Sequence, residues 1–151
     1  MGVTMLRPTR LTAACAVAIA LGVASGAACG SGQKPAPVVV AMAGQTVATT
    51  KLLTINTGIC DAARRAGTDI DAARQTFFGQ SHDGIHLIAR GLQDVDRDTS
   101  ATLLEAKQKV EADFLAPPPG PQVAADLRAL AAVTRSSLAR FKVSADACPS
   151  S

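Results

Sequence analysis

Residues Thr50–Gly67 read TKLLTINTGICDAARRAG, and this stretch sets the pattern for the folded part of the chain. Its apolar residues recur at steps of three and four, which places them on one face of a helix: Leu52, Ile55, Ile59, Ala62, Ala63 and Ala66. Arg64 and Arg65 stand in the last turn, where the helix dipole favours cations, and Gly67 can end the helix. The stretch predicts an amphipathic helix whose apolar face must pack against other elements.

The residues that follow predict a second helix with a break in it. Thr68–Asp71 supplies an N-cap and first-turn acids, and the helix then runs through Phe77. Gly79-Gln80-Ser81 predicts a kink or break, after which Ser81 can cap a new helical start. An apolar seam begins at Phe78, just before the break, and continues past it through Ile85, Ile88, Leu92 and Val95. The pattern indicates one long helix interrupted near Gly79.

Two more helices are predicted towards the C-terminus. Asp98 or Thr99 is expected to cap the third helix, whose main apolar residues are Leu103, Leu104, Val110 and Phe114. The run Pro117–Pro121 must end it, because proline lacks an amide donor and clashes with the preceding turn. The last helix carries Val123, Leu127, Leu130, Leu138 and Phe141.

The connections between these helices are short, so successive helices should be antiparallel neighbours. We therefore expect an all-α fold, a small four-helix up-down bundle over residues 50–148 with the second helix broken near Gly79, followed by a tail at 149–151.

The N-terminal region has the order of a secretory signal peptide. Arg7 and Arg10 precede an uncharged apolar run at residues 11–23, and the small residues of Ala24–Cys29 follow. The apolar run is shorter than the roughly 20 residues that a transmembrane helix needs. Residues 1–28 are therefore predicted to be a signal peptide, and the rest of the chain an exported domain.

Gly26-Ala27-Ala28-Cys29 resembles the lipobox of bacterial lipoproteins, with Gly26 standing where that family has leucine or another aliphatic residue. The resemblance implies cleavage before Cys29, diacylglycerol on its thiol, and anchoring to the outer face of the cell membrane or the cell envelope. The alternative is an ordinary secretory signal cleaved after Ala28, which would release the protein. Residues 29–49 would then be the lipidated cysteine and a flexible or extended linker, in which the role of Val38–Ala43 stays open.

Counting cysteines supports the anchor. Cys15 leaves with the signal, and lipidation of Cys29 would leave Cys60 and Cys148 to form a disulfide in an oxidising compartment. Cys60 lies well along the first helix, whereas Cys148 follows the last one. We therefore expect either that residues 143–147 fold back along the first helix or that the break near Gly79 alters the topology.

Both histidines of the chain lie four residues apart, at His82 and His86. On a helix they project from one side, close enough to share a metal ion, and Asp83 could supply a carboxylate. A third ligand could come from Asp94, Glu105 or Glu111. Imidazole and carboxylate ligands suit zinc, copper or nickel, and zinc or copper is the expected ion. The alternative is that the two histidines are partly solvated polar residues beside the apolar seam.

The string His82-Asp83-Gly84-Ile85-His86 also resembles the His-Glu-x-x-His motif of zincin metalloproteases, with Asp83 in place of the family's glutamate. The shorter side chain and the helix-weakening Gly84 depart from what the family's catalysis requires.

Composition narrows the function classes further. The chain has no Trp or Tyr and no basic cluster interleaved with aromatics, so no nucleic-acid partner is expected. No other catalytic motif is found in the sequence. We expect a non-enzymatic binding or interaction module with a protein or small-ligand partner, and as the alternative a metal-binding protein that uses His82 and His86.

Overall fold

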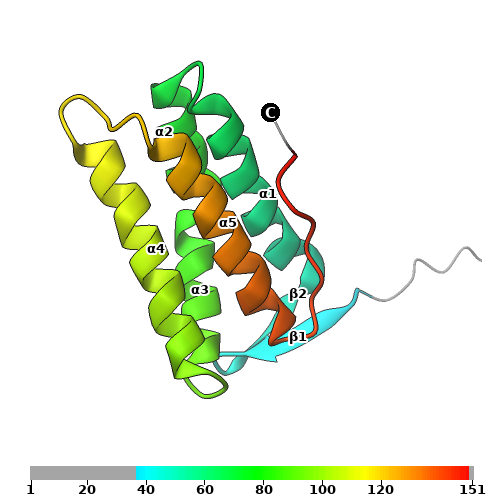
Figure 1. Ribbon diagram of the computed structural model, residues 1–151. Coiled ribbons are helices and arrows are strands. Elements are labelled where there is room, and N and C mark those ends of the chain that lie inside the picture. The colour runs from blue at the N-terminus through cyan, green and yellow to red at the C-terminus, as the bar shows by residue number, and fades with distance from the viewer. Residues whose placement is uncertain (1–36, 150–151) are drawn as a thin grey trace, which may run out of the picture. The chain divides into compact units, whose positions relative to one another are not determined.

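The structure is a computed structural model that describes residues 37–149. A β-hairpin, β1 (Val39–Met42) and β2 (Gln45–Ala48), comes first. Five helices follow: α1 (Thr49–Arg65), α2 (Ile70–Gln80), α3 (His82–Leu92), α4 (Arg97–Leu115) and α5 (Val123–Ala139) (Figure 1). The predicted helical character is confirmed, and the hairpin is an element that the helical pattern did not predict. The predicted signal peptide and Cys29 lie outside the described residues.

Within the linker predicted at residues 29–49, the hairpin corrects the expectation for residues 39–48. Its strands pair antiparallel, from Val39 opposite Ala48 to Met42 opposite Gln45. The turn residues Ala43 and Gly44 have φ values of 48° and 72°, as a tight hairpin turn with two left-handed residues requires. Met42 is only 4% exposed and Val47 5%, so the hairpin contributes to the core. Strands of four residues carry too short an alternation to stand out in the sequence.

Aspartates cap two of the helices. The Asp69 Oδ1 accepts a hydrogen bond from the Ala72 amide at 2.9 Å, within the stretch predicted to start α2. For α4 the prediction of Asp98 or Thr99 was wrong, because the Asp96 Oδ1 accepts the Thr99 amide at 3.0 Å. Asp98 lies instead in the first turn, where its charge is favoured by the helix dipole.

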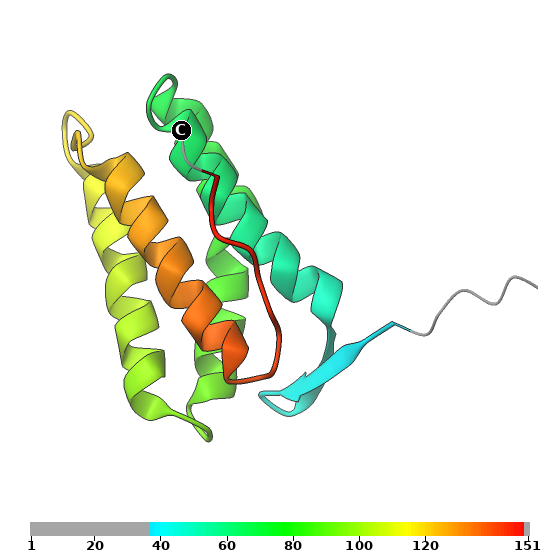
Figure 2. The same ribbon diagram turned by 45° about the vertical axis from the view of Figure 1, so that its right-hand side comes forward.

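The helices pack in neighbouring pairs. α1 packs mainly against α2 and α5, whereas α4 packs against α5 and α3 (Figure 2). Only Ser81 separates α2 from α3, two residues beyond the glycine near which the break was predicted. The hydroxyl of Ser81 does not cap α3; it donates to the carbonyl oxygen of Ile55 in α1 at 2.9 Å and is buried.

Glycines let α1 approach this break closely. A Cβ on Gly58 of α1 would lie 2.5 Å from the Ser81 hydroxyl oxygen. A Cβ on Gly84 of α3 would overlap the side chain of Ile55. The two glycines therefore allow α1 to lie closely against the start of α3.

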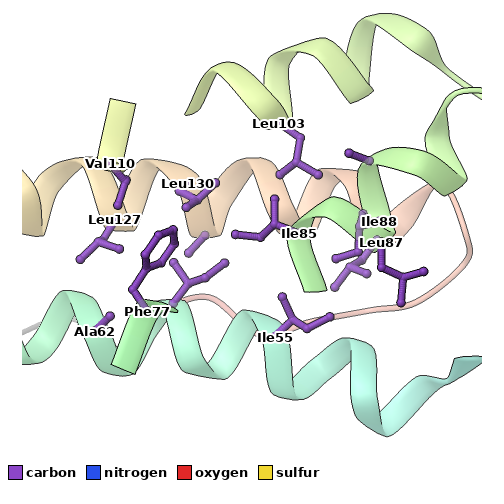
Figure 3. Close-up of a cluster of buried hydrophobic side chains, with 14 of the residues drawn as sticks. Ile55, Ala62, Phe77, Ile85, Leu87, Ile88, Leu103, Val110, Leu127 and Leu130 are labelled. Carbon is purple, nitrogen blue, oxygen red and sulfur yellow. The ribbon is translucent and has the colours of Figure 1, made fainter. Parts of the chain in front are cut away.

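The predicted apolar faces meet in one core (Figure 3). Its fully buried large side chains are Leu52, Ile59, Phe77, Ile85, Ile88, Leu92, Leu103, Val110, Phe114, Leu127, Leu130 and Leu138. Two members of the predicted seam are outside it, since Phe78 is 39% and Val95 58% exposed. The predicted seam assumes that α2 and α3 form one continuous helix. The break at Ser81 resets the helical phase, and Val95 lies past the end of α3.

The C-terminal segment folds back along α1 (Figure 2), which is one of the two predicted routes to the disulfide. Lys142 turns the chain with a φ of 59°, and Val143 is 4% exposed. The Asn56 side chain donates to the carbonyl oxygen of Asp146 at 3.0 Å. Cys60 and Cys148 are bonded with an S–S distance of 2.02 Å, as predicted.

The tight contact at Gly84 predicts a position-specific loss of stability. Gly84→Ala should lower the free energy of unfolding by roughly 1–3 kcal/mol, because the added methyl overlaps the buried Ile55. Gly79→Ala is the matched control: no atom lies within 4 Å of its added Cβ, and alanine favours helix by up to about 1 kcal/mol. Urea unfolding of both variants measures the difference. Equal midpoints would contradict the close approach.

The disulfide predicts a larger effect. Replacing Cys60 and Cys148 by alanine should lower the free energy of unfolding by roughly 4–5 kcal/mol, because the bond closes a loop with a sequence separation of 88 residues. Asn56→Ala, which removes one side-chain hydrogen bond from the same tail, should cost about 1 kcal/mol. Chemical denaturation with and without reductant measures both. A double cysteine variant no less stable than Asn56→Ala would contradict this account.

Candidate functional site

His82 is the first residue of α3, and carboxylates engage both of its ring nitrogens. Its Nδ1 lies 3.0 Å from Asp83 Oδ1, and its Nε2 lies 2.8 Å from Glu111 Oε1 of α4. The side chain is 25% exposed. The imidazole is therefore held in one orientation by groups from two helices.

Glu111 also holds a buried lysine. The Lys107 Nζ lies 2.8 Å from Glu111 Oε1, and the Lys107 side chain is only 5% exposed. A lysine four residues before a glutamate is the less favourable order on an isolated helix, so helix stability alone does not account for the pair. A buried ammonium requires a partner, and Glu111 supplies the charge.

The cluster shifts the pKa values of two of its members. Burial alone would raise the pKa of Glu111, but the hydrogen bonds from Lys107 and His82 outweigh it and lower the pKa. The pKa of His86 is lowered by the partial burial of its ring and by the positive charge of Lys107. His86 is exposed, one turn from His82, with the ring centroids 5.1 Å apart. At a given pH, a larger fraction of His86 is therefore neutral than of a free histidine.

Aromatic rings surround His82 on its other side. Its ring centroid lies 6.2 Å from that of Phe77 and 5.3 Å from that of Phe78. The Phe114 ring lies 6.1 Å from Phe78 and is covered by the Arg74 guanidinium at 5.9 Å. Phe77 and Phe114 are buried in the core, whereas Phe78 faces solvent beside the histidine. The site therefore combines a buried apolar wall with an accessible edge.

A groove of about 580 Å³ opens beside the cluster, between the first turns of α1 and the α2–α3 junction. Its lining includes Lys51, Thr54, Gln80 and Asp83. Because Asp83 also contacts His82, the groove and the histidine are connected through one side chain.

The structure brings together only part of the predicted ligand set. Of the carboxylates proposed as a third ligand, Glu111 reaches His82, Glu105 is exposed, and Asp94 lines a different groove beside the hairpin. Asp83 contacts Nδ1 of His82 and its side chain is 100% exposed. Within residues 37–149, no group of three or more His, Cys, Asp or Glu side chains is placed to hold a metal ion.

Lys107 is the member that the sequence reasoning missed. It lies four residues after Leu103 and three before Val110, on the buried stripe of α4. The sequence signal that could have identified it is a lysine at an apolar position of the predicted helix.

A second group of charged residues lies between α4 and α5. Asp113 and Asp126 are each 8% exposed. Lys109 Nζ lies 2.7 Å from Asp126 Oδ1, and Gln122 donates to Asp113 Oδ1 at 2.9 Å. Burial and the hydrogen bond with Asp126 raise the pKa of Asp113. Burial opposes ionisation of Asp126 as well, but hydrogen bonds from Lys109 and Asp113 outweigh it and lower its pKa. A proton taken up by the pair is therefore favoured on Asp113 over Asp126.

Comparison of the chain with protein-family models, with curated proteins and with solved structures finds no match. Over the described residues 37–149, none of the helices has the length and apolar character needed to cross a membrane. The function must therefore be argued from the residues themselves.

The aspartate pair predicts a pH-dependent stability. Because the pKa of Asp113 is higher in the folded protein, the fold binds this proton more tightly than the unfolded chain. This contribution is present below the unfolded value of 3.8 and is lost as pH rises through the raised pKa. Asp113→Asn keeps a neutral donor to Asp126, so it should remove that loss and stabilise the protein at pH 7 by about 0.5–1 kcal/mol.

Urea midpoints measured from pH 4 to pH 8 test this, with the exposed Asp94→Asn as control. A wild-type and an Asp113→Asn profile of the same shape would contradict proton sharing.

Proposed function

We propose that this chain is an exported domain of the bacterial cell envelope, anchored by lipid on Cys29, which acts by binding a partner and not by catalysis. The observation that carries the proposal is the Cys60–Cys148 disulfide. It uses both cysteines of the folded domain, so Cys29 is the one cysteine past the predicted cleavage position that remains for another role. Disulfides also persist mainly in oxidising compartments outside the cytosol.

The domain that this anchor would present is, we propose, a four-membered up-down bundle. In this interpretation α2 and α3 act as one helix interrupted at Ser81, and α1, α4 and α5 are the other members. The short separation of α2 from α3 supports it, as do the packing of α1 on α2 and α5 and that of α4 on α3 and α5.

The surface proposed for binding is the His82 cluster, which comprises His82, His86, Lys107 and Glu111 with the exposed Phe78. Taking charges out of water is costly, and a buried ion pair is weak support for stability by itself. A pair that orients an accessible histidine next to an exposed aromatic ring is better explained by recognition. The alternative function, metal binding through His82 and His86, is favoured by the contact of Glu111 with His82.

The anchor predicts a simple fractionation result. Expressed in a bacterial host, the wild-type chain should sediment with membranes, and its intact mass should match a diacylated chain that begins at Cys29. Cys29→Ala should abolish the lipid and release the protein, because the acceptor thiol is gone. Cys15→Ala, which lies inside the predicted signal, is the matched control and should behave as wild type.

Intact mass spectrometry of membrane and soluble fractions measures all three. A wild-type chain that is soluble and begins elsewhere, or a Cys29→Ala chain that keeps its lipid, would overturn the anchor.

A further inference from the structure

We propose that His82, His86 and Glu111 bind one transition-metal ion of the zinc class, and that the ammonium of Lys107 balances the charge of Glu111 while the ion is absent. The inference names a ligand for the proposed binding surface and therefore rests on that binding role. It does not depend on the lipid anchor, which a separate experiment tests.

His82 Nε2 and Glu111 Oε1 are both atoms that can bind a metal. They come from different helices and lie 2.8 Å apart. Tetrahedral zinc binds nitrogen and carboxylate oxygen at about 2.0–2.1 Å, which sets two of its ligands roughly 3.3 Å apart. If the two atoms move about half an ångström further apart, the ion can therefore take the place of the proton in their hydrogen bond. That proton is released to solvent.

His86 supplies the third ligand. It lies one turn along α3 from His82, and the two ring centroids are 5.1 Å apart. Its side chain is exposed, so the ring can turn between staggered rotamers without disturbing the core. Within residues 37–149 no three such side chains are already placed to hold a metal ion, so the proposed site requires this rotation of His86, and water can take the fourth position.

Asp83 fits the role of an orienting partner. It contacts Nδ1 of His82 at 3.0 Å, on the side of the ring opposite the proposed ion. Histidines that bind metals commonly donate their other ring N–H to a carboxylate, which fixes the ring and makes the free nitrogen a stronger ligand. Asp83, which the sequence suggested as a ligand, is therefore assigned to positioning.

The ammonium of Lys107 competes with the proposed ion for Glu111. Its ammonium lies 2.8 Å from the Glu111 Oε1 that would bind the ion, and its side chain is almost fully buried. Two positive charges cannot share that oxygen at low cost in a partly desolvated site. Lys107 must move away as the ion enters, so it weakens binding. A neutral side chain of similar length at this position should bind metal more tightly.

The test is calorimetric titration of ZnCl2 into the full chain, purified without a histidine tag and stripped by chelator. All variants carry Cys15→Ser and Cys29→Ser, so that thiols outside the disulfide do not bind zinc. We expect one zinc ion per chain. His82→Gln, His86→Gln and Glu111→Gln should each weaken binding about tenfold or more, whereas Lys107→Met should tighten it about tenfold.

Two control variants change the same residue types at exposed positions. Glu105→Gln and Lys51→Met should leave the zinc affinity unchanged. CoCl2 provides a second readout, because tetrahedral cobalt with these ligands gives visible absorption that Glu111→Gln should alter and Glu105→Gln should not. Thermal unfolding without metal confirms that each variant is folded.

The proposal is overturned if zinc does not bind, if Glu111→Gln behaves as Glu105→Gln does, or if Lys107→Met binds zinc no more tightly than Lys51→Met. If zinc does not bind but Cys29 is lipidated, the metal site is rejected and the anchored binding domain is retained. If zinc binds as expected but Cys29 is not lipidated, the anchor is rejected and the metal site is retained.

Discussion

At the α2–α3 junction the Ser81 hydroxyl is buried and donates to the carbonyl oxygen of Ile55 in α1. This contact exists because Gly58 and Gly84 have no side chains to keep the helices apart. The charged cluster depends on it, since it joins the start of α3 to α1. His82, the first residue of α3, then lies beside α4, with its Nε2 2.8 Å from Glu111 Oε1.

The ends of the domain are secured by elements that contribute little core of their own. The hairpin adds Met42 and Val47 to the apolar interior. The C-terminal segment adds Val143 and is held to α1 by the Asn56 hydrogen bond and the disulfide. A small helical domain buries a limited fraction of its surface, so a covalent link that constrains the unfolded chain is a substantial part of its stability.

The charged residues of α4 serve two different neighbours. Lys107 and Glu111 face α3, where they meet His82, whereas Lys109 and Asp113 face α5, where they meet Asp126. Both groups place partly desolvated charges next to the hydrophobic core, and both are compensated across a helix interface. Only the first includes exposed imidazole and aromatic groups, which is why recognition is assigned to that side of α4.

The sequence by itself determined the helical character and the break close to Gly79, because these depend on local periodicity and turn chemistry. It also determined the Cys60–Cys148 pairing, which follows from the number of cysteines, and it identified His82 and His86 as candidate site residues. It did not determine the hairpin, whose strands are too short to show a pattern. Choosing Glu111 over two other carboxylates, and pairing it with a buried lysine, required the packing of α3 on α4. Contacts between residues distant in the chain depend on helix rotation and crossing, which local spacing does not encode, so only the tertiary structure decided them.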